Sequence, residues 1–109
     1  MHRITIVILA LLFSCLGWGQ ANPSVTRVPF DSQALHQRAP FNVILPAGYE
    51  NSVRRYPVLY LLHGIGDHYD TWVTNTNLAE YARPYQLIIV MPEGDKGWYV
   101  NGTVPNSRW

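Results

Sequence analysis

The clearest chemical signal in this sequence is the segment His-Gly-Ile-Gly at residues 63–66, which directly follows an apolar run at Val58–Leu62. A run that is apolar or aromatic on both faces is typical of a central strand in a parallel sheet. Glycine has no Cβ, so two glycines in four residues allow a sharp turn or a close approach to another group. Ligands of open α/β sheets bind just beyond the carboxyl ends of the strands, so we expect the backbone N–H groups of this loop to face a substrate.

A second apolar run at Leu87–Met91 predicts another buried parallel strand, and Pro92–Asp95 is its terminating loop. Between the two runs, Asn77 and Glu80 have the spacing of a capping box, which predicts a helix that opens at the next residue, position 78. The helix is expected to be short, roughly two turns, because Pro84 is taken to exclude helical geometry at Arg83. The strand, helix and strand then form a βαβ unit.

The N-terminal half predicts two further strands, one irregular at Ser24–Phe30 and one at Phe41–Leu45. Strands joined by short polar connections are expected to run antiparallel, and the polar stretch Asp31–Pro40 is interpreted as a connection. The fold class is therefore α/β, with an antiparallel start followed by parallel strands and a crossover helix. Since one short helix cannot cover both faces of such a sheet, we expect the 109-residue chain to be incomplete.

The first 21 residues have the features of a secretory signal peptide. A basic start at Met1–Arg3 precedes an apolar run at Ile4–Leu16, and small residues lead to a cleavage site after Ala21. The run is shorter than the roughly 20 residues that a membrane-spanning helix needs, so no stable membrane span is expected. Residues 22–109 would form the mature, secreted or periplasmic chain. Attachment of a lipid at Cys15 is the alternative, although Phe13 fits a lipoprotein signal poorly.

The charge distribution excludes a nucleic-acid partner. Eight Lys and Arg residues are balanced by seven Asp and Glu residues, and the basic ones are scattered along the chain. A nucleic-acid-binding surface needs basic residues clustered on one face. The charges therefore identify no macromolecular partner, and the sequence does not specify an oligomeric state.

Three segments together resemble a known family. They are Tyr-Pro-Val-Leu-Tyr-Leu-Leu-His-Gly-Ile-Gly-Asp-His at 56–68, Asp-Thr-Trp at 70–72 and Ile-Ile-Val-Met-Pro-Glu-Gly at 88–94. In this order and spacing they are similar to the N-terminal part of serine esterases of the α/β-hydrolase fold. This group contains esterase D (S-formylglutathione hydrolase), tributyrin-type and feruloyl esterases, and mycolyl transferases. The resemblance covers residues 41–109 and implies hydrolysis of carboxylic esters or thioesters by a serine nucleophile.

By this resemblance, the backbone N–H of Ile65 is half of an oxyanion hole, shaped by His63, Gly64 and Gly66. Such a hole stabilises the negative charge of the tetrahedral intermediate. The Gly-x-Ser-x-Gly elbow of the family is absent from these 109 residues. Because the family's histidine follows its serine and acid in the chain, the whole triad would lie beyond residue 109. His63 is therefore interpreted as a residue that shapes the loop and does not itself catalyse.

Trp98, Tyr99 and Asn101 resemble the aromatic loop beside the acyl pocket of these esterases, and they imply a small-molecule ester substrate with an apolar acyl chain. The alternative is that the aromatic rings only cover core or surface. The acyl and alcohol groups of the substrate cannot be chosen from the sequence.

No cofactor or metal is expected. Asp67, His68 and Asp70 could in principle hold a cation, but their spacing matches no known ligand pattern, which favours a solvated turn. Asp70 and Trp72 are expected to brace the loop beneath the active-site rim. The competing functional hypothesis is a binding module that has the α/β-hydrolase sheet without catalytic activity.

Overall fold

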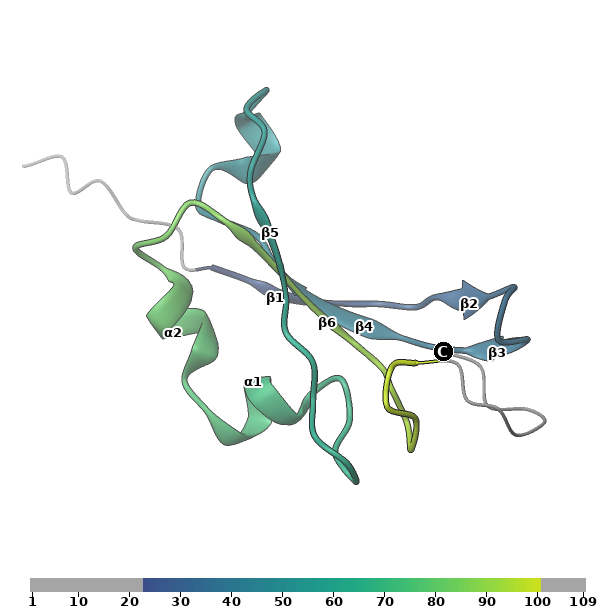
Figure 1. Cartoon of the computed structure of the whole chain (residues 1–109). Helices are drawn as coiled ribbons and strands as arrows, with labels where there is room; N and C mark the ends of the chain where they lie inside the picture. The colour runs from purple at the N-terminus through teal and green to yellow at the C-terminus, as the bar shows by residue number, and fades with distance from the viewer. Residues whose placement is uncertain (1–22, 101–109) are drawn as a thin grey trace, which may run out of the picture.

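The computed structural model describes residues 23–100. The predicted signal peptide with its cleavage site, Cys15 and the candidate Asn101 lie outside the described residues. Along residues 23–100, no helix combines the length and the hydrophobicity needed to cross a membrane. The elements, in chain order, are β1 (Val25–Val28), β2 (Asp31–Ser32), β3 (Gln37–Arg38), β4 (Phe41–Ile44), the 3-10 helix η1 (Tyr49–Asn51), β5 (Val58–Tyr60), α1 (Thr71–Asn75), α2 (Leu78–Ala82) and β6 (Ile88–Pro92) (Figure 1).

Four strands form one mixed sheet in the order β1-β4-β6-β5. β1 pairs antiparallel with β4, and β4 pairs antiparallel with β6, with Ile44 opposite Ile89. β5 and β6 run parallel, with Leu59 opposite Ile89. This arrangement confirms the predicted antiparallel start followed by a parallel βαβ unit, because α1 and α2 lie between the two parallel strands in the chain.

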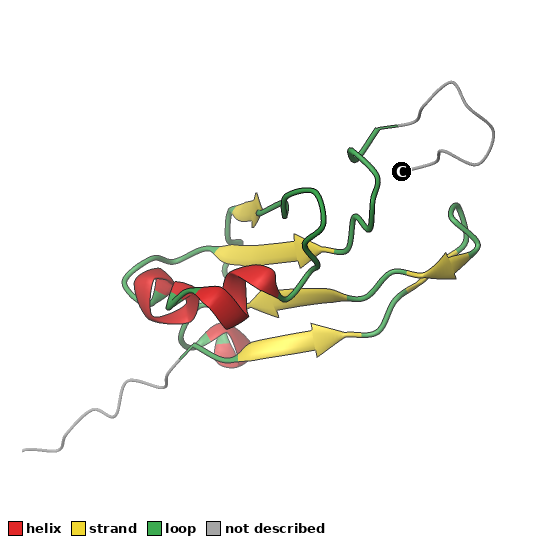
Figure 2. Ribbon diagram, turned by 90° about the horizontal axis from the view of Figure 1, so that it is seen from below, coloured by secondary structure: helices red, strands yellow, loops and turns green. Residues whose placement is uncertain are grey.

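The core lies on one face of the sheet. Buried and half-buried residues alternate along β4 and β6, and the buried apolar side chains Ile44, Ile89 and Met91 form one cluster. Side chains of both helices, including Trp72 and Leu78, pack against this cluster. Figure 2 shows both helices on the same side of the strands. Neither α1 nor α2 covers the opposite face of the sheet.

The prediction that β5 is a central strand buried on both faces is wrong for the described chain. β5 lies at the edge of the sheet and pairs only with β6. Val58 and Leu59 are each 47% exposed, and Tyr60 and Leu62 are exposed as well. The reason is physical: β5 has the apolar sequence of a covered strand, but no other segment of residues 23–100 covers its faces or pairs with its outer edge.

The helix α2 begins at the predicted residue, Leu78, but the predicted side-chain cap is not formed. α2 opens at Leu78 with Asn77 as its N-cap, yet the Asn77 side chain makes no capping hydrogen bond. Arg83 has helical angles (φ −49°, ψ −46°), so the expectation that Pro84 excludes such geometry there is wrong. The restriction before proline is a preference and not a prohibition, and the helix still ends at Ala82.

The polar stretch interpreted as a connection contains a small hairpin. β2 and β3 pair antiparallel, with Asp31 opposite Arg38, and they extend beyond the ends of β1 and β4 (Figure 1). The Arg38 Nε lies 3.3 Å from the Asp31 carboxylate, and both side chains are exposed. An exposed pair of this kind contributes little stability, roughly 0–1 kcal/mol. The sequence contains no alternating apolar pattern here, which explains why the hairpin was missed.

Candidate active site

Two loops meet at the edge of the sheet where β5 and β6 end. Because these strands are parallel, their carboxyl ends lie at the same edge, and the Leu61 N–H continues the ladder by donating to the Val90 carbonyl at 2.9 Å. We name residues 63–67 the glycine loop and residues 93–97 the acidic loop. Ligands of α/β sheets bind at this edge, so the position of the glycine loop agrees with the expectation from the sequence.

The glycine loop is a tight turn from Gly64 to Asp67. The Asp67 N–H donates to the Gly64 carbonyl at 3.2 Å, and the third residue, Gly66, has φ +82°. A positive φ at the third position is the signature of a type II turn, which favours glycine. Gly64 has no positive φ, and a Cβ placed there would lie 3.3 Å from the Asp67 carboxylate. Gly66 is therefore the position whose backbone conformation requires glycine.

His63 connects the two loops from a buried position. Its side chain is only 2% exposed, with Nδ1 2.8 Å from the Gly64 carbonyl oxygen and Nε2 2.8 Å from the Gly94 nitrogen. A carbonyl can only accept and a backbone N–H can only donate, which assigns the neutral tautomer with its proton on Nδ1. The Nδ1–H thus donates to Gly64 while Nε2 accepts from Gly94. The ring therefore contacts the backbone of both loops.

The Gly64–Ile65 peptide is oriented by these bonds. The carbonyl of Gly64 accepts from both the His63 ring and the Asp67 N–H. In a trans peptide the C=O and N–H bonds point in opposite directions, and none of the described peptide bonds is cis. The Ile65 N–H therefore points away from the His63 ring, and within residues 23–100 it makes no hydrogen bond. A free, fixed N–H is what an oxyanion donor requires.

Trp72 supports the strand end that leads into the glycine loop. Its indole N–H donates to the Leu62 carbonyl at 3.0 Å, directly before His63. This contact is the bracing role expected for Trp72. Asp70 acts through its backbone instead, because its carbonyl accepts the N–H groups that open α1 and its side chain makes no capping bond.

The candidate acyl-pocket residues have different surroundings. Trp98 is 71% exposed. The Tyr99 ring stands edge-on to His63 with centroids 5.4 Å apart, and its hydroxyl oxygen accepts the His63 N–H at 3.2 Å. A Cβ on Gly94 would come within 2.3 Å of the Tyr99 ring, so this packing depends on a glycine. Burial raises the pKa of Tyr99 and the nearby Glu93 charge raises it further, which outweighs the lowering by the His63 N–H.

Glu93 is the site residue that the sequence reasoning missed. Its side chain is 12% exposed and lies between His63 and His68. The sequence signal that could have identified it is an acidic residue directly after the carboxyl end of a second parallel strand, at the edge where ligands bind. Burial raises the pKa of Glu93, but N–H bonds from Asp95 and Tyr69 and the neighbouring His68 outweigh that effect, so the pKa lies below its ordinary value.

The described side chains form no group that could hold a metal. Within residues 23–100, no three His, Cys, Asp or Glu side chains lie close enough together to coordinate an ion. His68 contacts Glu93 at 3.3 Å, away from any arrangement with Asp67 and Asp70 that would form a cation site.

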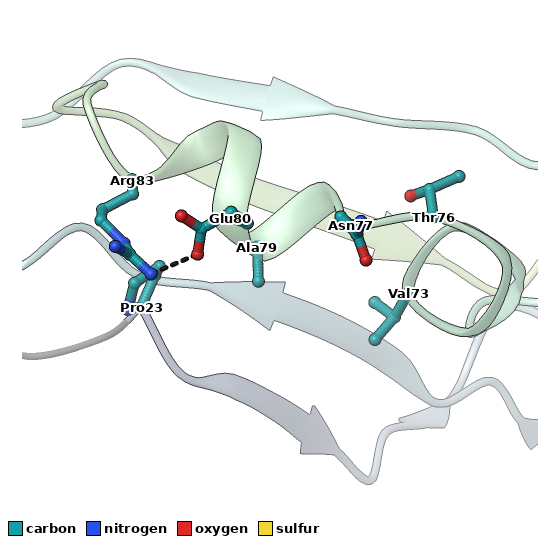
Figure 3. A pocket seen from close by; sticks show the side chains of 7 residues that line it. All are labelled: Pro23, Val73, Thr76, Asn77, Ala79, Glu80 and Arg83. Carbon is teal, nitrogen blue, oxygen red and sulfur yellow. Dashed lines mark hydrogen bonds and ion pairs between the residues drawn. The ribbon is translucent and has the colours of Figure 1, made fainter.

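A surface hollow lies beside the helices, at the opposite end of β6 from the acidic loop. Arg83 and Glu80 form an ion pair at its rim (Figure 3). The sheet register places it at this end, because Val25 is opposite Ile44, which is opposite Ile89 near the start of β6. This hollow is therefore not part of the candidate active site. Its volume is about 320 Å³, and it is lined by Pro23, Val73, Thr76, Asn77, Ala79, Glu80 and Arg83.

Comparison with known proteins identifies relatives over most of the chain. Residues 32–108 match the model of a family described as "Putative esterase". Two relatives from Mycobacterium tuberculosis, Esterase MT1326 (strain CDC 1551) and Esterase Rv1288 (strain H37Rv), are each 37% identical over 82 residues. The match covers 73% of this chain but only 18% of each relative.

Solved structures share the fold. A ferulic acid esterase superposes with a TM-score of 0.69 at 22% identity, over 80% of this chain and 38% of that one. The S-formylglutathione hydrolase FrmB of Staphylococcus aureus gives 0.66 at 20% identity, over 82% and 37%. A ferulic acid esterase from Anaeromyces mucronatus, in complex with ferulic acid, gives 0.54 at 30% identity, over 81% and 35%. The α/β-hydrolase fold class is confirmed, and the chain spans less than two fifths of each of these structures.

Proposed function

This chain belongs to the esterase family that residues 32–108 match, and on that premise we propose that its glycine loop supplies an oxyanion donor to a serine hydrolase of carboxylic esters or thioesters. The donor is the Ile65 N–H. The observation that carries the proposal is the Gly64–Ile65 peptide, whose carbonyl is held by the His63 ring and the Asp67 N–H. The opposite end of that peptide is therefore presented outward at the carboxyl edge of the sheet.

The proposed reaction begins when a serine oxygen attacks the ester carbonyl carbon, whose oxygen becomes an alkoxide. The Ile65 N–H donates a hydrogen bond to that alkoxide, together with the N–H of the residue after the serine. One donor of this kind contributes about 3 kcal/mol to transition-state stability. A histidine base takes the serine proton during attack and gives it to the leaving oxygen or sulfur as the intermediate collapses, so that an alcohol or thiol leaves and an acyl-serine remains. Water then hydrolyses the acyl-serine, which releases the acid and restores the serine hydroxyl.

The nucleophile of this reaction would come from sequence outside these 109 residues, which lack a Gly-x-Ser-x-Gly elbow. The chain would thus act as the N-terminal part of the esterase. Its length agrees with this proposal, since it spans 38% of the matched ferulic acid esterase.

The substrate is proposed to be a small ester whose acyl group lies beside Trp98, Tyr99 and Asn101. Two of the structurally similar proteins have names that refer to ferulic acid, and a third is a hydrolase of S-formylglutathione. Both oxygen esters and thioesters therefore belong in the first substrate panel. Tyr99 lies beside the glycine loop through its contact with His63.

Export is part of the proposal, with residues 1–21 as a signal peptide. The basic start, short apolar run and small residues before Asn22 support it. N-terminal sequencing of the exported protein should give Asn22 as the first residue. A lipid-modified Cys15, or uncleaved protein that stays in the cytosol, would contradict this part of the proposal.

The activity is tested with the whole gene product and a short p-nitrophenyl ester. We expect turnover that a serine-directed phosphonate abolishes, and no turnover above background from the 109-residue chain alone. Phosphonate-sensitive activity of the 109-residue chain would refute the proposed location of the nucleophile. A whole gene product that binds esters without hydrolysing them would instead favour a non-catalytic binding module.

A further inference from the structure

Glu93 joins the acidic loop to the segment that follows the glycine loop. Its Oε1 accepts the Asp95 N–H at 2.7 Å, and its Oε2 accepts the Tyr69 N–H at 3.3 Å. The His68 Nδ1 lies 3.3 Å from Oε2 and 3.4 Å from Oε1. One carboxylate therefore holds donors from the acidic loop and from the segment that follows the glycine loop.

The Glu93 carboxylate is largely buried, and burial of a charged group costs solvation free energy. A charged group removed from water loses solvation unless hydrogen bonds replace it, and bonds to a charged acceptor are the strong ones. The donors around Glu93 are two backbone N–H groups and one imidazole, from positions 24 and 25 residues earlier and two residues later in the chain. They keep the carboxylate in one place and, with it, the backbone of the acidic loop.

The backbone that Glu93 holds is the one that fixes His63. Gly94 follows Glu93 directly, and its N–H donates to the His63 Nε2 at 2.8 Å. That bond requires an unprotonated Nε2, which leaves the proton of neutral His63 on Nδ1, where it donates to Gly64. The contacts thus run from Glu93 through Gly94 and His63 to the Gly64–Ile65 peptide.

Glu93 also constrains the other protonation state of His63. Its Oε1 lies 3.2 Å from Nε2, so a doubly protonated ring would donate to Glu93 instead of accepting from Gly94. In both states Nδ1 carries a proton and donates to the Gly64 carbonyl. The tautomer protonated only at Nε2 would lose the bond to Gly64, because an unprotonated Nδ1 would meet a carbonyl, and its Nε2–H could donate only to Glu93 and not pair with the Gly94 N–H.

We propose that Glu93 is a positioning residue for the oxyanion donor, which acts through Gly94 and His63 to keep the Ile65 N–H aimed at the substrate. This inference rests on the proposed esterase function. Glu93 touches neither the substrate nor the reacting atoms in this scheme. Its effect on catalysis comes from the His63 tautomer, so it can be separated from a general effect on stability.

The test compares Glu93→Ala and Glu93→Gln in the whole gene product, with Glu80→Ala as the matched control. Glu80 is an exposed acid on α2 that pairs with Arg83, away from both loops. For Glu93→Ala we expect kcat on a p-nitrophenyl ester to fall about tenfold with KM within about twofold, because a misaimed donor weakens only the transition state. Glu80→Ala should leave both constants unchanged.

The second measurement is the 15N spectrum of the histidine rings, which reports which ring nitrogen of His63 carries the proton. We expect the Nδ1–H tautomer in the wild type and in Glu80→Ala, and a mixture of both tautomers in Glu93→Ala. Glu93→Gln keeps the shape and one acceptor oxygen but removes the charge. It should show a smaller fall in kcat and serves as the decisive variant if Glu93→Ala does not fold.

The results separate the two proposals. A folded Glu93 variant with an unchanged His63 tautomer and unchanged kcat overturns the positioning role, and so does a change confined to KM. If the wild-type gene product has no esterase turnover, the proposed function fails, and the tautomer spectra still decide whether Glu93 controls His63. A tautomer shift in Glu93→Ala without a loss of kcat would also overturn the positioning role, because the His63 tautomer would then have no effect on the oxyanion donor.

Discussion

Substitutions of His63 can test the contributions of its two ring nitrogens separately, because Nδ1 bonds to Gly64 and Nε2 bonds to Gly94. The amide N–H of asparagine can occupy the position of the His63 Nδ1–H, whereas the carbonyl oxygen of glutamine can reach the position of Nε2. His63→Asn should therefore keep the donor to the Gly64 carbonyl, and His63→Gln should keep the acceptor for the Gly94 N–H. Alanine removes both.

The expected magnitudes follow from what each variant leaves unpaired. Gly94 is buried, so the loss of its acceptor in His63→Asn or His63→Ala leaves a buried N–H unsatisfied and lowers the free energy of unfolding by about 1–3 kcal/mol. In His63→Gln the Gly64 carbonyl still accepts the Asp67 N–H at 3.2 Å, so we expect a loss of only about 1 kcal/mol.

The asparagine and glutamine variants should rank in opposite orders in stability and in kcat, whereas His63→Ala should lose both. Removal of a complete oxyanion donor lowers kcat by about 10² to 10³, and a misaimed donor should lose part of that factor. We expect His63→Gln and His63→Ala to lose at least about tenfold in kcat and His63→Asn no more than about threefold. The assays are urea unfolding and steady-state ester hydrolysis of the whole gene product. Equal rate losses in the asparagine and glutamine variants, or a near-wild-type rate in folded His63→Ala, would refute the reasoning.

Four further predictions concern the loops and the sheet. Gly66→Ala should cost about 1–2 kcal/mol of unfolding free energy because of its φ of +82°, and more than Gly64→Ala in the same denaturant titration. Trp72→Phe loses the indole bond to Leu62 and should cost about 1 kcal/mol, measured by thermal unfolding. Because the pKa of Glu93 is lowered in the folded chain, its contribution to stability is present above its ordinary pKa of 4.5 and is lost as the pH falls through the folded value. Glu93→Gln should therefore flatten the acid side of a stability–pH curve, and an unchanged acid slope would contradict this. The 109-residue chain should bind the dye ANS through the exposed apolar residues of β5, and a monomeric, dye-silent chain would argue against it.

Local sequence signals predicted the elements that have local causes. The apolar run ending at Met91 became β6, and α2 starts after Asn77 as the capping spacing predicted, although the Asn77 side chain makes no capping bond. The glycines after the first apolar run located the tight turn, since Gly66 needs a positive φ. In each case, a few neighbouring residues carry the physical reason.

The sequence could not show contacts between distant segments. Glu93 belongs to the site because it meets His63 and His68, which lie 30 and 25 residues away in the chain, and no periodic pattern records such a meeting. The same limit applies to β5, whose apolar sequence indicates that it can be covered but not which segment covers it. The pairing of β2 with β3 rests on backbone bonds between polar residues, which leave no hydrophobic pattern in the sequence.

The position of β6 between β4 and β5 sets an order for folding during synthesis. β1 and β4 are near neighbours in the chain and can pair as soon as both leave the ribosome. β4 and β5, in contrast, each have β6 as a partner, and Ile44 must wait for Ile89, which is translated 45 residues later. Until β6 has been translated, β4 and β5 each have an edge whose backbone N–H and C=O groups are unpaired. The entropy cost of closing a loop of this length slows the pairing of β4 with β6. The nascent chain therefore passes through a stage in which premature pairing between neighbouring nascent chains competes with the arrival of β6.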